Sequence, residues 1–179
     1  ICEIFMEIGL PAGVVNVIHG DRSIPGTWYE DPRMAGVCLV GSTPTAKKMA
    51  EGCARGAKRS MLLGGAKNLL LVMEDSNMDV FINNFLNSCY GSAGQRCLAG
   101  SIVAAVPEVY EEVLERMIEA SKTVKVGDAF DPDVYMGPLI SRKAADNVLN
   151  YVDIALKHGQ GCKLVLDRRR VDLPEKNKN

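Results

Sequence analysis

The sequence predicts an α/β fold, and two observations carry that prediction. Short runs of apolar, often β-branched residues alternate along the whole chain with stretches of helical periodicity, as expected for sheets flanked by helices. In addition, one apolar run leads directly into a Gly-Ser-Thr turn and a helical stretch at residues 41–57, which places a helix N-terminus beside the end of a strand. The chain contains no internal repeat.

Composition limits the classes of function. The 179 residues, 47% of them hydrophobic, suffice for one domain or parts of two with a true core. A net charge of −1 gives no reason to expect nucleic acid or an anionic membrane as partner. No apolar run approaches the roughly 18 residues of a membrane-spanning helix. The chain begins without Met or a secretory signal, and residues 1–5 read as the middle of a helix, so we expect a piece of a longer protein.

The six cysteines indicate reduced thiols. They are scattered without Cys-x-x-Cys spacing, and the chain has only two histidines, so neither a disulfide framework nor a zinc site is expected. We therefore expect a soluble protein of a reducing compartment, the mitochondrial matrix or the cytoplasm. Cys38, Cys53 and Cys162 are interpreted as buried structural thiols.

The first part of the chain predicts two strands and a capped helix. A helix ends near Gly9, and strands are expected at residues 14–18 and 36–40. A helix is expected over residues 45–57, with Thr43 as its N-cap. The turn that precedes it, with the Ser42 hydroxyl, suits a phosphate, although an ordinary capped helix explains it equally well.

The second part continues the alternation. Strands are expected at residues 69–73, 102–106 and 163–166, and helices at 78–90, 107–122 and 141–157, the last capped by Ser141. From residue 167 onward the chain is charged, and we expect a mobile tail.

Residues 91–97 (Gly-Ser-Ala-Gly-Gln-Arg-Cys) hold the candidate nucleophile. A reactive cysteine needs a nearby cation or hydrogen-bond donors, and access for substrate. Cys97 has Arg96 beside it and small residues before it, but no histidine close in sequence, which disfavours a papain-like hydrolase. On these residues alone, Cys97 is either a nucleophile or a buried thiol.

Five segments together resemble the aldehyde dehydrogenase superfamily, in its order and with its spacing. They are residues 9–17 (Gly-Leu-Pro-Ala-Gly-Val-Val-Asn-Val), 40–43 (Val-Gly-Ser-Thr), 63–68 (Leu-Gly-Gly-Ala-Lys-Asn), 94–97 (Gly-Gln-Arg-Cys) and 137–140 (Gly-Pro-Leu-Ile). The resemblance implies that Cys97 is the catalytic cysteine. It also implies the end of a Rossmann-like NAD-binding domain over residues 1–63 and the start of the α/β catalytic domain over 64–166, before the tail at 167–179.

Within the superfamily the chain is most similar to the CoA-acylating branch, typified by methylmalonate-semialdehyde dehydrogenase. Residues 65–68 (Gly-Ala-Lys-Asn) and the arginine directly before Cys97 carry this resemblance. Hydrolytic members have a general-base glutamate where this chain has Leu62. Without that base, coenzyme A, which brings its own thiol, is the expected acyl acceptor.

The resemblance also implies the remaining roles. A methylmalonate or malonate semialdehyde would be oxidised with NAD to propionyl-CoA or acetyl-CoA and carbon dioxide, as in valine catabolism, by a parent enzyme that is a homotetramer. Arg96 would bind the substrate carboxylate. Gly41, Ser42 and Gly64 would bind NAD, and the amide of Cys97 would be an oxyanion donor.

Parts of the family pattern lie outside the 179 residues. These are the ribose-binding lysine and glutamates, the oxyanion asparagine and the oligomerisation strand. We therefore expect the isolated chain to be inactive. Two alternatives remain: a hydrolytic semialdehyde dehydrogenase that lacks its base, and a truncated, non-catalytic paralogue that acts as an interaction module.

Overall fold

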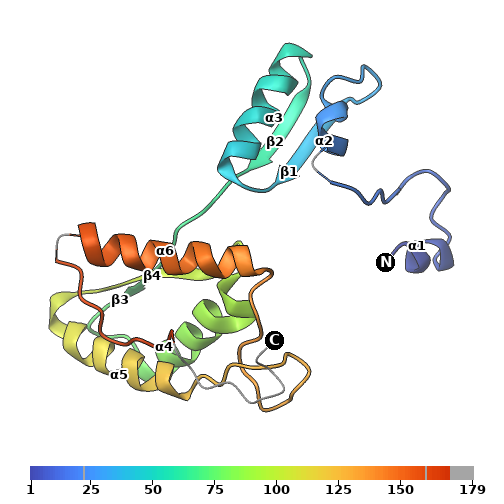
Figure 1. Cartoon of the computed structure of the whole chain (residues 1–179). Coiled ribbons are helices and arrows are strands. Elements are labelled where there is room, and N and C mark those ends of the chain that lie inside the picture. The colour runs from blue at the N-terminus through green and yellow to red at the C-terminus, as the bar shows by residue number, and fades with distance from the viewer. Residues whose placement is uncertain (22, 160, 170–179) are drawn as a thin grey trace. The chain divides into compact units, whose positions relative to one another are not determined.

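The computed structural model describes residues 1–21, 23–159 and 161–169. The chain divides into two compact units, Ile1–Gly65 and Ala66–Asn179, each built around a two-stranded parallel sheet. Figure 1 shows the order of helices and strands in each unit. The α/β fold class expected from the sequence is confirmed. The functional assignment of domains at residues 1–63 and 64–166 stays a prediction.

The first unit centres on a strand–helix–strand motif. Strands β1 (Gly36–Val40) and β2 (Arg59–Leu63) pair in parallel, and helix α3 (Thr43–Arg55) connects them. Two short helices, α1 (Cys2–Glu7) and α2 (Ser23–Trp28), come before the motif. Parallel pairing needs such a crossover, and it brings the ends of β1 and β2 together beside the N-terminus of α3.

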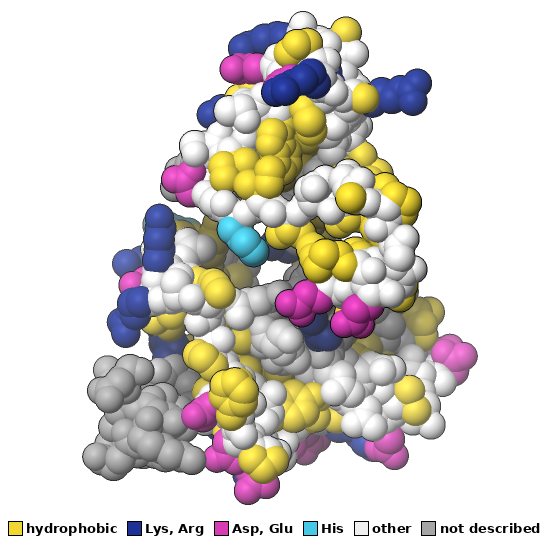
Figure 2. All heavy atoms as spheres, turned by 90° about the vertical axis from the view of Figure 1, so that its right-hand side faces the viewer, with side chains coloured by type: hydrophobic (Ala, Val, Ile, Leu, Met, Phe, Trp, Pro, Cys, Tyr) yellow, Lys and Arg dark blue, Asp and Glu magenta, His cyan; other side chains and the backbone are white. Residues whose placement is uncertain are grey.

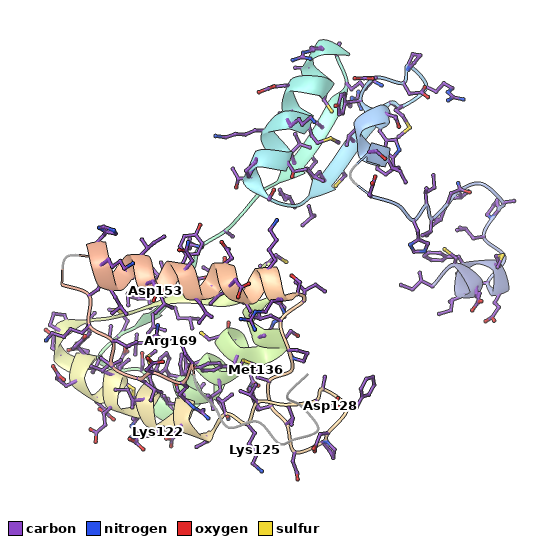
Figure 3. The ribbon with its side chains drawn as sticks, in the orientation of Figure 1. Lys122, Lys125, Asp128, Met136, Asp153 and Arg169 are labelled. Carbon is purple, nitrogen blue, oxygen red and sulfur yellow. The ribbon has the colours of Figure 1, made fainter. Side chains whose placement is uncertain are left out.

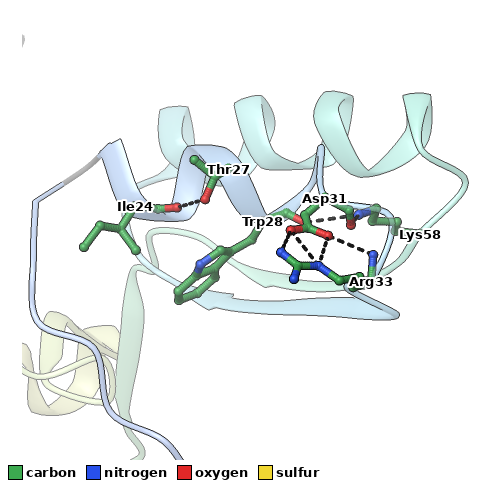
Figure 4. Close-up of polar contacts among 6 residues, drawn as sticks. All are labelled: Ile24, Thr27, Trp28, Asp31, Arg33 and Lys58. Atoms are coloured by element: carbon green, nitrogen blue, oxygen red, sulfur yellow. Dashed lines mark hydrogen bonds and ion pairs between the residues drawn. The ribbon is translucent and has the colours of Figure 1, made fainter.

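A small core holds this motif together. Val37, Met49 and Cys53 are buried, and Tyr29, Leu39 and Leu62 pack against them. Outside the core, the Lys58 ammonium donates hydrogen bonds to the backbone carbonyls of Trp28 (3.1 Å) and Asp31, and the Asp31 carboxylate pairs with Arg33 (Figure 4). Lys58 thereby ties the segment after α2 to the start of β2.

The first unit differs from the sequence prediction at two places. The expected strand at residues 14–18 is not a strand, because this segment is exposed and pairs with no other strand within the described residues. Conversely, β2 was not expected, although its Met-Leu-Leu run is apolar. The strand begins with Arg59, directly after Lys58, and these charged residues interrupt the apolar pattern by which a buried strand is recognised.

The second unit has the same plan with more helix. Strands β3 (Asn68–Val72) and β4 (Gly100–Ala105) pair in parallel. Between them run helix α4 (Met78–Phe85), a π-helical turn η1 (Leu86–Tyr90) and a 3₁₀ turn η2 (Gly91–Gly94). After β4 come the 3₁₀ turn η3 (Pro107–Val109), helix α5 (Tyr110–Thr123) and helix α6 (Arg142–His158).

Helices α4 and α5 lie side by side in the second unit. Arg116 of α5 reaches the Asp79 carboxylate of α4 at 2.9 Å. Val72, Phe85 and Val113 are buried, and the ring of Phe85 meets Tyr90 edge-on with centroids 5.6 Å apart. This packing fixes the end of α4, where η1 begins.

Most elements expected in the second unit are present, with shifts of one or two residues at their ends. Ser141 caps α6 as expected, accepting a hydrogen bond from the Ala144 amide at 3.1 Å. The helix expected over 78–90 changes to π and 3₁₀ turns after Phe85. Residues 163–166, expected to form a strand, have no regular secondary structure and form no strand pairing within the described part of the chain. In the expected mobile tail, residues 170–179 lie outside the described residues.

Many apolar side chains reach the surface, where they lie between charged ones (Figure 2). On β3 the side chains of Leu69 and Leu71 are 56% and 60% exposed, while Val72 is buried. None of the helices among the described residues is both long and apolar enough to cross a membrane.

Candidate functional site

The first candidate site is the turn between β1 and α3. The Gly41 amide donates a hydrogen bond to the Leu63 carbonyl at 3.0 Å, so Gly41 lies beside the end of β2. The Thr43 hydroxyl accepts a hydrogen bond from the Gly65 amide, also at 3.0 Å. Two of the segments singled out in the sequence, 40–43 and 63–68, therefore meet at the carboxyl edge of this sheet.

The N-cap of α3 is Ser42. The prediction from the sequence that Thr43 is the N-cap is therefore wrong. Ser42 has extended dihedrals and its hydroxyl accepts from the Thr45 amide at 3.4 Å, while Thr43 is already helical. The physical reason is the contact to Gly65: the Thr43 hydroxyl is engaged across the turn and cannot cap the helix.

This turn fits a phosphate group. A Cβ on Gly64 would lie only 3.1 Å from the Thr43 hydroxyl oxygen, whereas one on Gly41 would meet nothing nearer than 3.6 Å. Small residues thus let a ligand approach the backbone at the N-terminus of the 13-residue helix α3. At this turn the residues present suit one phosphate of a dinucleotide.

The second candidate site is the turn that carries Cys97. The Ala99 amide donates to the Arg96 carbonyl at 3.1 Å, which closes a four-residue turn with Cys97 at its second position. Cys97 is exposed. Within the described residues, the peptide N–H groups of Cys97 and Leu98 have no hydrogen-bond partner. The turn therefore offers an accessible thiol next to two backbone donors.

Asn68 braces this turn from the neighbouring strand. Its side-chain nitrogen donates to the carbonyls of Cys97 at 2.8 Å and Ala99 at 2.9 Å. The pairing of β3 with β4 is irregular between Asn68 and Leu69, and such an irregularity redirects side chains. The lysine-asparagine end of segment 63–68 thus reaches the cysteine turn.

Arg96 holds the other side of the loop. One terminal nitrogen of its guanidinium donates to the backbone carbonyls of Asn87 and, at 3.1 Å, Ser88. These carbonyls belong to η1, and a cation at the end of a helix is favoured there. Arg96 is exposed, so the substrate-binding role expected of it stays a prediction.

The backbone between η1 and Cys97 is strained. Ser92, Ala93 and Gly94 have φ angles of 53°, 53° and 69°, and left-handed dihedrals cost a non-glycine residue roughly 1–2 kcal/mol each. A π-helical turn directly before them is also typical of functional sites. The contacts of Asn68 and Arg96 stabilise a loop that would not adopt this shape alone.

The loop over residues 124–140 provides two more contacts. The Tyr135 hydroxyl donates to the Asn87 side-chain oxygen at 2.8 Å, and the Ile140 amide donates to the Gln95 side-chain oxygen at 3.0 Å. The loop is itself closed, because the amides of Tyr135 and Met136 both donate to the Lys125 carbonyl at 3.0 Å. Lys125 and Met136 are labelled on this loop in Figure 3. Segments 137–140 and 94–97 therefore also meet.

Leu62, which the sequence motifs align with the base of hydrolytic family members, stays a predicted counterpart of that base. It lies in β2, is partly buried and packs against the core of the first unit. An apolar side chain in that place can neither accept a proton nor orient a water molecule.

Two of the three cysteines that were interpreted as buried structural thiols are not buried. Cys53 is buried as expected, but Cys38 and Cys162 are exposed. Burial raises the pKa of the Cys89 thiol. Exposed thiols thus occur in several places, and what distinguishes Cys97 is the braced turn with its two unpaired amides.

Comparison with known proteins agrees with this geometry. The family model described as "Aldehyde dehydrogenase family" matches residues 1–179. The chain belongs to the aldehyde dehydrogenase family. The resemblance expected from the sequence motifs is confirmed, and so is the fold.

Individual relatives are semialdehyde dehydrogenases. Malonate-semialdehyde dehydrogenase 3 of Geobacillus kaustophilus is 37% identical over 170 residues, which cover 95% of this chain and 35% of the relative. A Sinorhizobium meliloti protein assigned as a methylmalonate-semialdehyde dehydrogenase, solved in complex with NAD, matches with a TM-score of 0.90 at 33% identity; the match covers 98% of this chain and 36% of that one.

A third relative also has a semialdehyde dehydrogenase name. The methylmalonate-semialdehyde dehydrogenase of Oceanimonas doudoroffii also matches with a TM-score of 0.90, at 35% identity, over 98% of this chain and 36% of its own. The chain thus spans about 35% of the length of the relatives that it matches.

Proposed function

We propose that this chain supplies the catalytic cysteine and part of the NAD site of a CoA-acylating dehydrogenase of malonate or methylmalonate semialdehyde. The observation that carries the proposal is the exposed thiol of Cys97, on a turn braced from three directions and next to two unpaired peptide N–H groups. Relatives at 33–37% identity with semialdehyde names support the substrate class.

Cys97 acts as the nucleophile. Its sulfur attacks the aldehyde carbon, and the carbonyl oxygen becomes an oxyanion that the amides of Cys97 and Leu98 are suited to stabilise. NAD, when bound, accepts the hydride that leaves this carbon. The carbon then remains on Cys97 as a thioester.

Acyl transfer completes the reaction. The thiol of coenzyme A attacks the thioester, forming a new carbon–sulfur bond and releasing the Cys97 thiol. The substrate carboxylate leaves as carbon dioxide: its bond to the α-carbon breaks, and that carbon takes up a proton from water, so that the product is acetyl-CoA or propionyl-CoA. Leu62 supports this acceptor over water, because hydrolysis requires a base that it cannot provide.

Two further groups of residues bind the reactants. Arg96 pairs with the substrate carboxylate through guanidinium nitrogens other than the one held by Asn87 and Ser88. In the first unit, Gly41 and Ser42 receive the pyrophosphate of NAD at the N-terminus of α3, and Gly64 lines the nicotinamide side by its backbone.

We infer that residues beyond this segment complete the site, since the chain spans about 35% of its relatives' length. The isolated chain is therefore expected to form no NADH from malonate semialdehyde. NADH production by the purified 179-residue chain would contradict this.

The test uses a hybrid enzyme, in which the 170 aligned residues of this chain replace their counterparts in the G. kaustophilus enzyme. NADH formation from malonate semialdehyde should need coenzyme A, and acetyl-CoA should accumulate. The unaltered G. kaustophilus enzyme is the control. Equal sustained turnover without coenzyme A would instead support the hydrolytic alternative, and a hybrid that folds but forms no NADH would support a non-catalytic module.

A further inference from the structure

The brace from Asn68 acts on two particular backbone atoms. Its side-chain nitrogen donates hydrogen bonds to two backbone carbonyls, those of Cys97 and Ala99. These carbonyls flank the corner of the turn that the Ala99 amide closes onto Arg96. Asn68 therefore holds the peptide unit between Cys97 and Leu98 and the peptide unit between Ala99 and Gly100.

A hydrogen bond that holds the Cys97 carbonyl also fixes the direction of the Leu98 N–H. A peptide unit is planar and trans, so the N–H of Leu98 points away from the carbonyl of Cys97. With that carbonyl held by Asn68, the Leu98 N–H points to the side of the turn opposite Asn68. The Gly100 amide, in the peptide unit of the Ala99 carbonyl, donates to the Ser88 hydroxyl at 2.8 Å, which fixes the second unit as well.

The remaining donors of the turn are unpaired. The N–H groups of Cys97 and Leu98 have no partner among the described residues, and Asn68 itself is half-buried at the start of β3. Unpaired donors of fixed direction stabilise a developing negative charge without first having to reorganise. Donors on a loose exposed turn would lack that advantage.

We propose that Asn68 is a positioning residue that, through the Cys97 carbonyl, holds the peptide N–H group of Leu98 in the direction required to stabilise the oxyanion formed during acylation of Cys97. The inference rests on the proposed role of Cys97 as the nucleophile. Asn68 touches no reacting atom: it acts through the turn.

Two reagents separate this role from a merely structural one. p-Nitrophenyl acetate acetylates a thiol through a tetrahedral oxyanion: the sulfur–carbon bond forms, the ester carbon–oxygen bond breaks and p-nitrophenolate leaves. Iodoacetamide alkylates the same thiol by direct displacement of iodide, with no oxyanion. Mass spectrometry of the 179-residue chain measures both modifications at Cys97, with the exposed Cys162 as internal reference.

In the unaltered chain, the ratio of acetylation to alkylation should be higher at Cys97 than at Cys162. Asn68→Ala and Asn68→Leu should each slow acetylation of Cys97 by about tenfold, less than the loss expected when a whole oxyanion donor is deleted. Alkylation should change by less than about twofold, because it needs no oxyanion. Asn68→Leu nearly preserves the size of the side chain and removes the donors without adding a charge.

Asn77→Ala is the matched control, because Asn77 caps α4 through the Val80 amide and does not contact the turn. It should change neither reaction at Cys97. Equal slowing of both reactions by the Asn68 variants, or no slowing of either, would overturn the proposal, as would equal ratios at Cys97 and Cys162 in the unaltered chain. Failure of the proposed function is separate: it would appear as turnover by a Cys97→Ser hybrid enzyme.

Discussion

The two candidate sites are built in different ways. In the first unit the turn at Gly41 and Gly64 is made of backbone and small residues. Because these residues have no large side chains, the backbone N–H groups are open to a ligand. In the second unit the Cys97 turn is held by side chains, among them Asn68, Gln95 and Arg96. The first arrangement leaves room for the phosphate that we propose there, whereas the second holds a strained loop in one shape.

This difference indicates a division of tasks. A cofactor that must bind and leave needs access to backbone donors, which glycine and a helix N-terminus provide. A nucleophile needs a fixed position relative to the donors that stabilise its intermediate. Substitutions in the two units should therefore affect different kinetic constants.

The largest effect is expected at Arg96. In the hybrid enzyme, Arg96→Ala should lower kcat/KM for malonate semialdehyde about 100-fold, because a hydrogen bond to a charged partner contributes about 1.5–3 kcal/mol. For propanal, which has no carboxylate, the loss should stay below about fivefold. Arg142→Ala, which removes an exposed arginine paired with Asp146, is the control and should change neither value. Equal losses for both aldehydes would mean that Arg96 serves only to hold Asn87 and Ser88.

A change in packing of the first unit comes next. Gly52 is buried in α3, and a Cβ there would lie 2.4 Å from the Tyr29 ring. Gly52→Ala, which usually stabilises a helix, should here lower the free energy of unfolding by about 1–2 kcal/mol. Gly26→Ala is the control, since its Cβ would meet nothing nearer than 4.0 Å. Denaturant unfolding measures both, and a more stable Gly52→Ala variant would refute the packing described.

The cofactor turn should respond to a substitution that the fold tolerates. A Cβ at Gly41 would touch only Leu39, at 3.6 Å, so Gly41→Val should leave the melting temperature nearly unchanged. It should raise the KM for NAD in the hybrid enzyme about tenfold, the equivalent of one backbone hydrogen bond. Acetylation of Cys97 by p-nitrophenyl acetate should be unaffected. If the KM for NAD of the Gly41→Val variant is unchanged, the pyrophosphate of NAD does not bind at this turn.

The smallest effect is expected on the surface of the first unit. Hydrogen bonds from the Arg33 side chain and backbone hold the pKa of Asp31 well below its usual range. The ionised carboxylate therefore stabilises the fold above the unfolded-state pKa of about 4, and this stabilisation disappears as the pH falls through the folded-state value. The melting temperature of Asp31→Asn should lie slightly below that of the unaltered chain at pH 7, and the gap should narrow in acid. A gap that widens in acid would contradict this assignment.

Local sequence predicted the first site better than the second. The strand, the Gly-Ser-Thr turn and the helix at residues 36–55 are adjacent in the chain, so their pattern is visible directly. Only the N-cap was assigned one residue late, because the contact between Thr43 and Gly65 spans 22 residues. A pattern in one segment carries no signal for such a contact.

The second site depends on distant residues. Asn68 lies 29 residues before Cys97, Tyr135 lies 48 residues after Asn87, and Ile140 lies 45 after Gln95. The motifs containing Asn68, Gln95 and Ile140 were recognised, but not that they meet. Neither the left-handed dihedrals of Ser92 and Ala93 nor the π-helical turn has a clear local signature, since tertiary contacts impose both.

The acyl group that Cys97 is proposed to carry between aldehyde and coenzyme A can be observed directly. The hybrid enzyme is mixed with malonate semialdehyde and NAD, quenched in acid and examined by mass spectrometry. We expect an acyl adduct on the peptide containing Cys97 that accumulates without coenzyme A, disappears when coenzyme A is added, and yields acetyl-CoA. NADH formation with Cys97 unmodified throughout would contradict it.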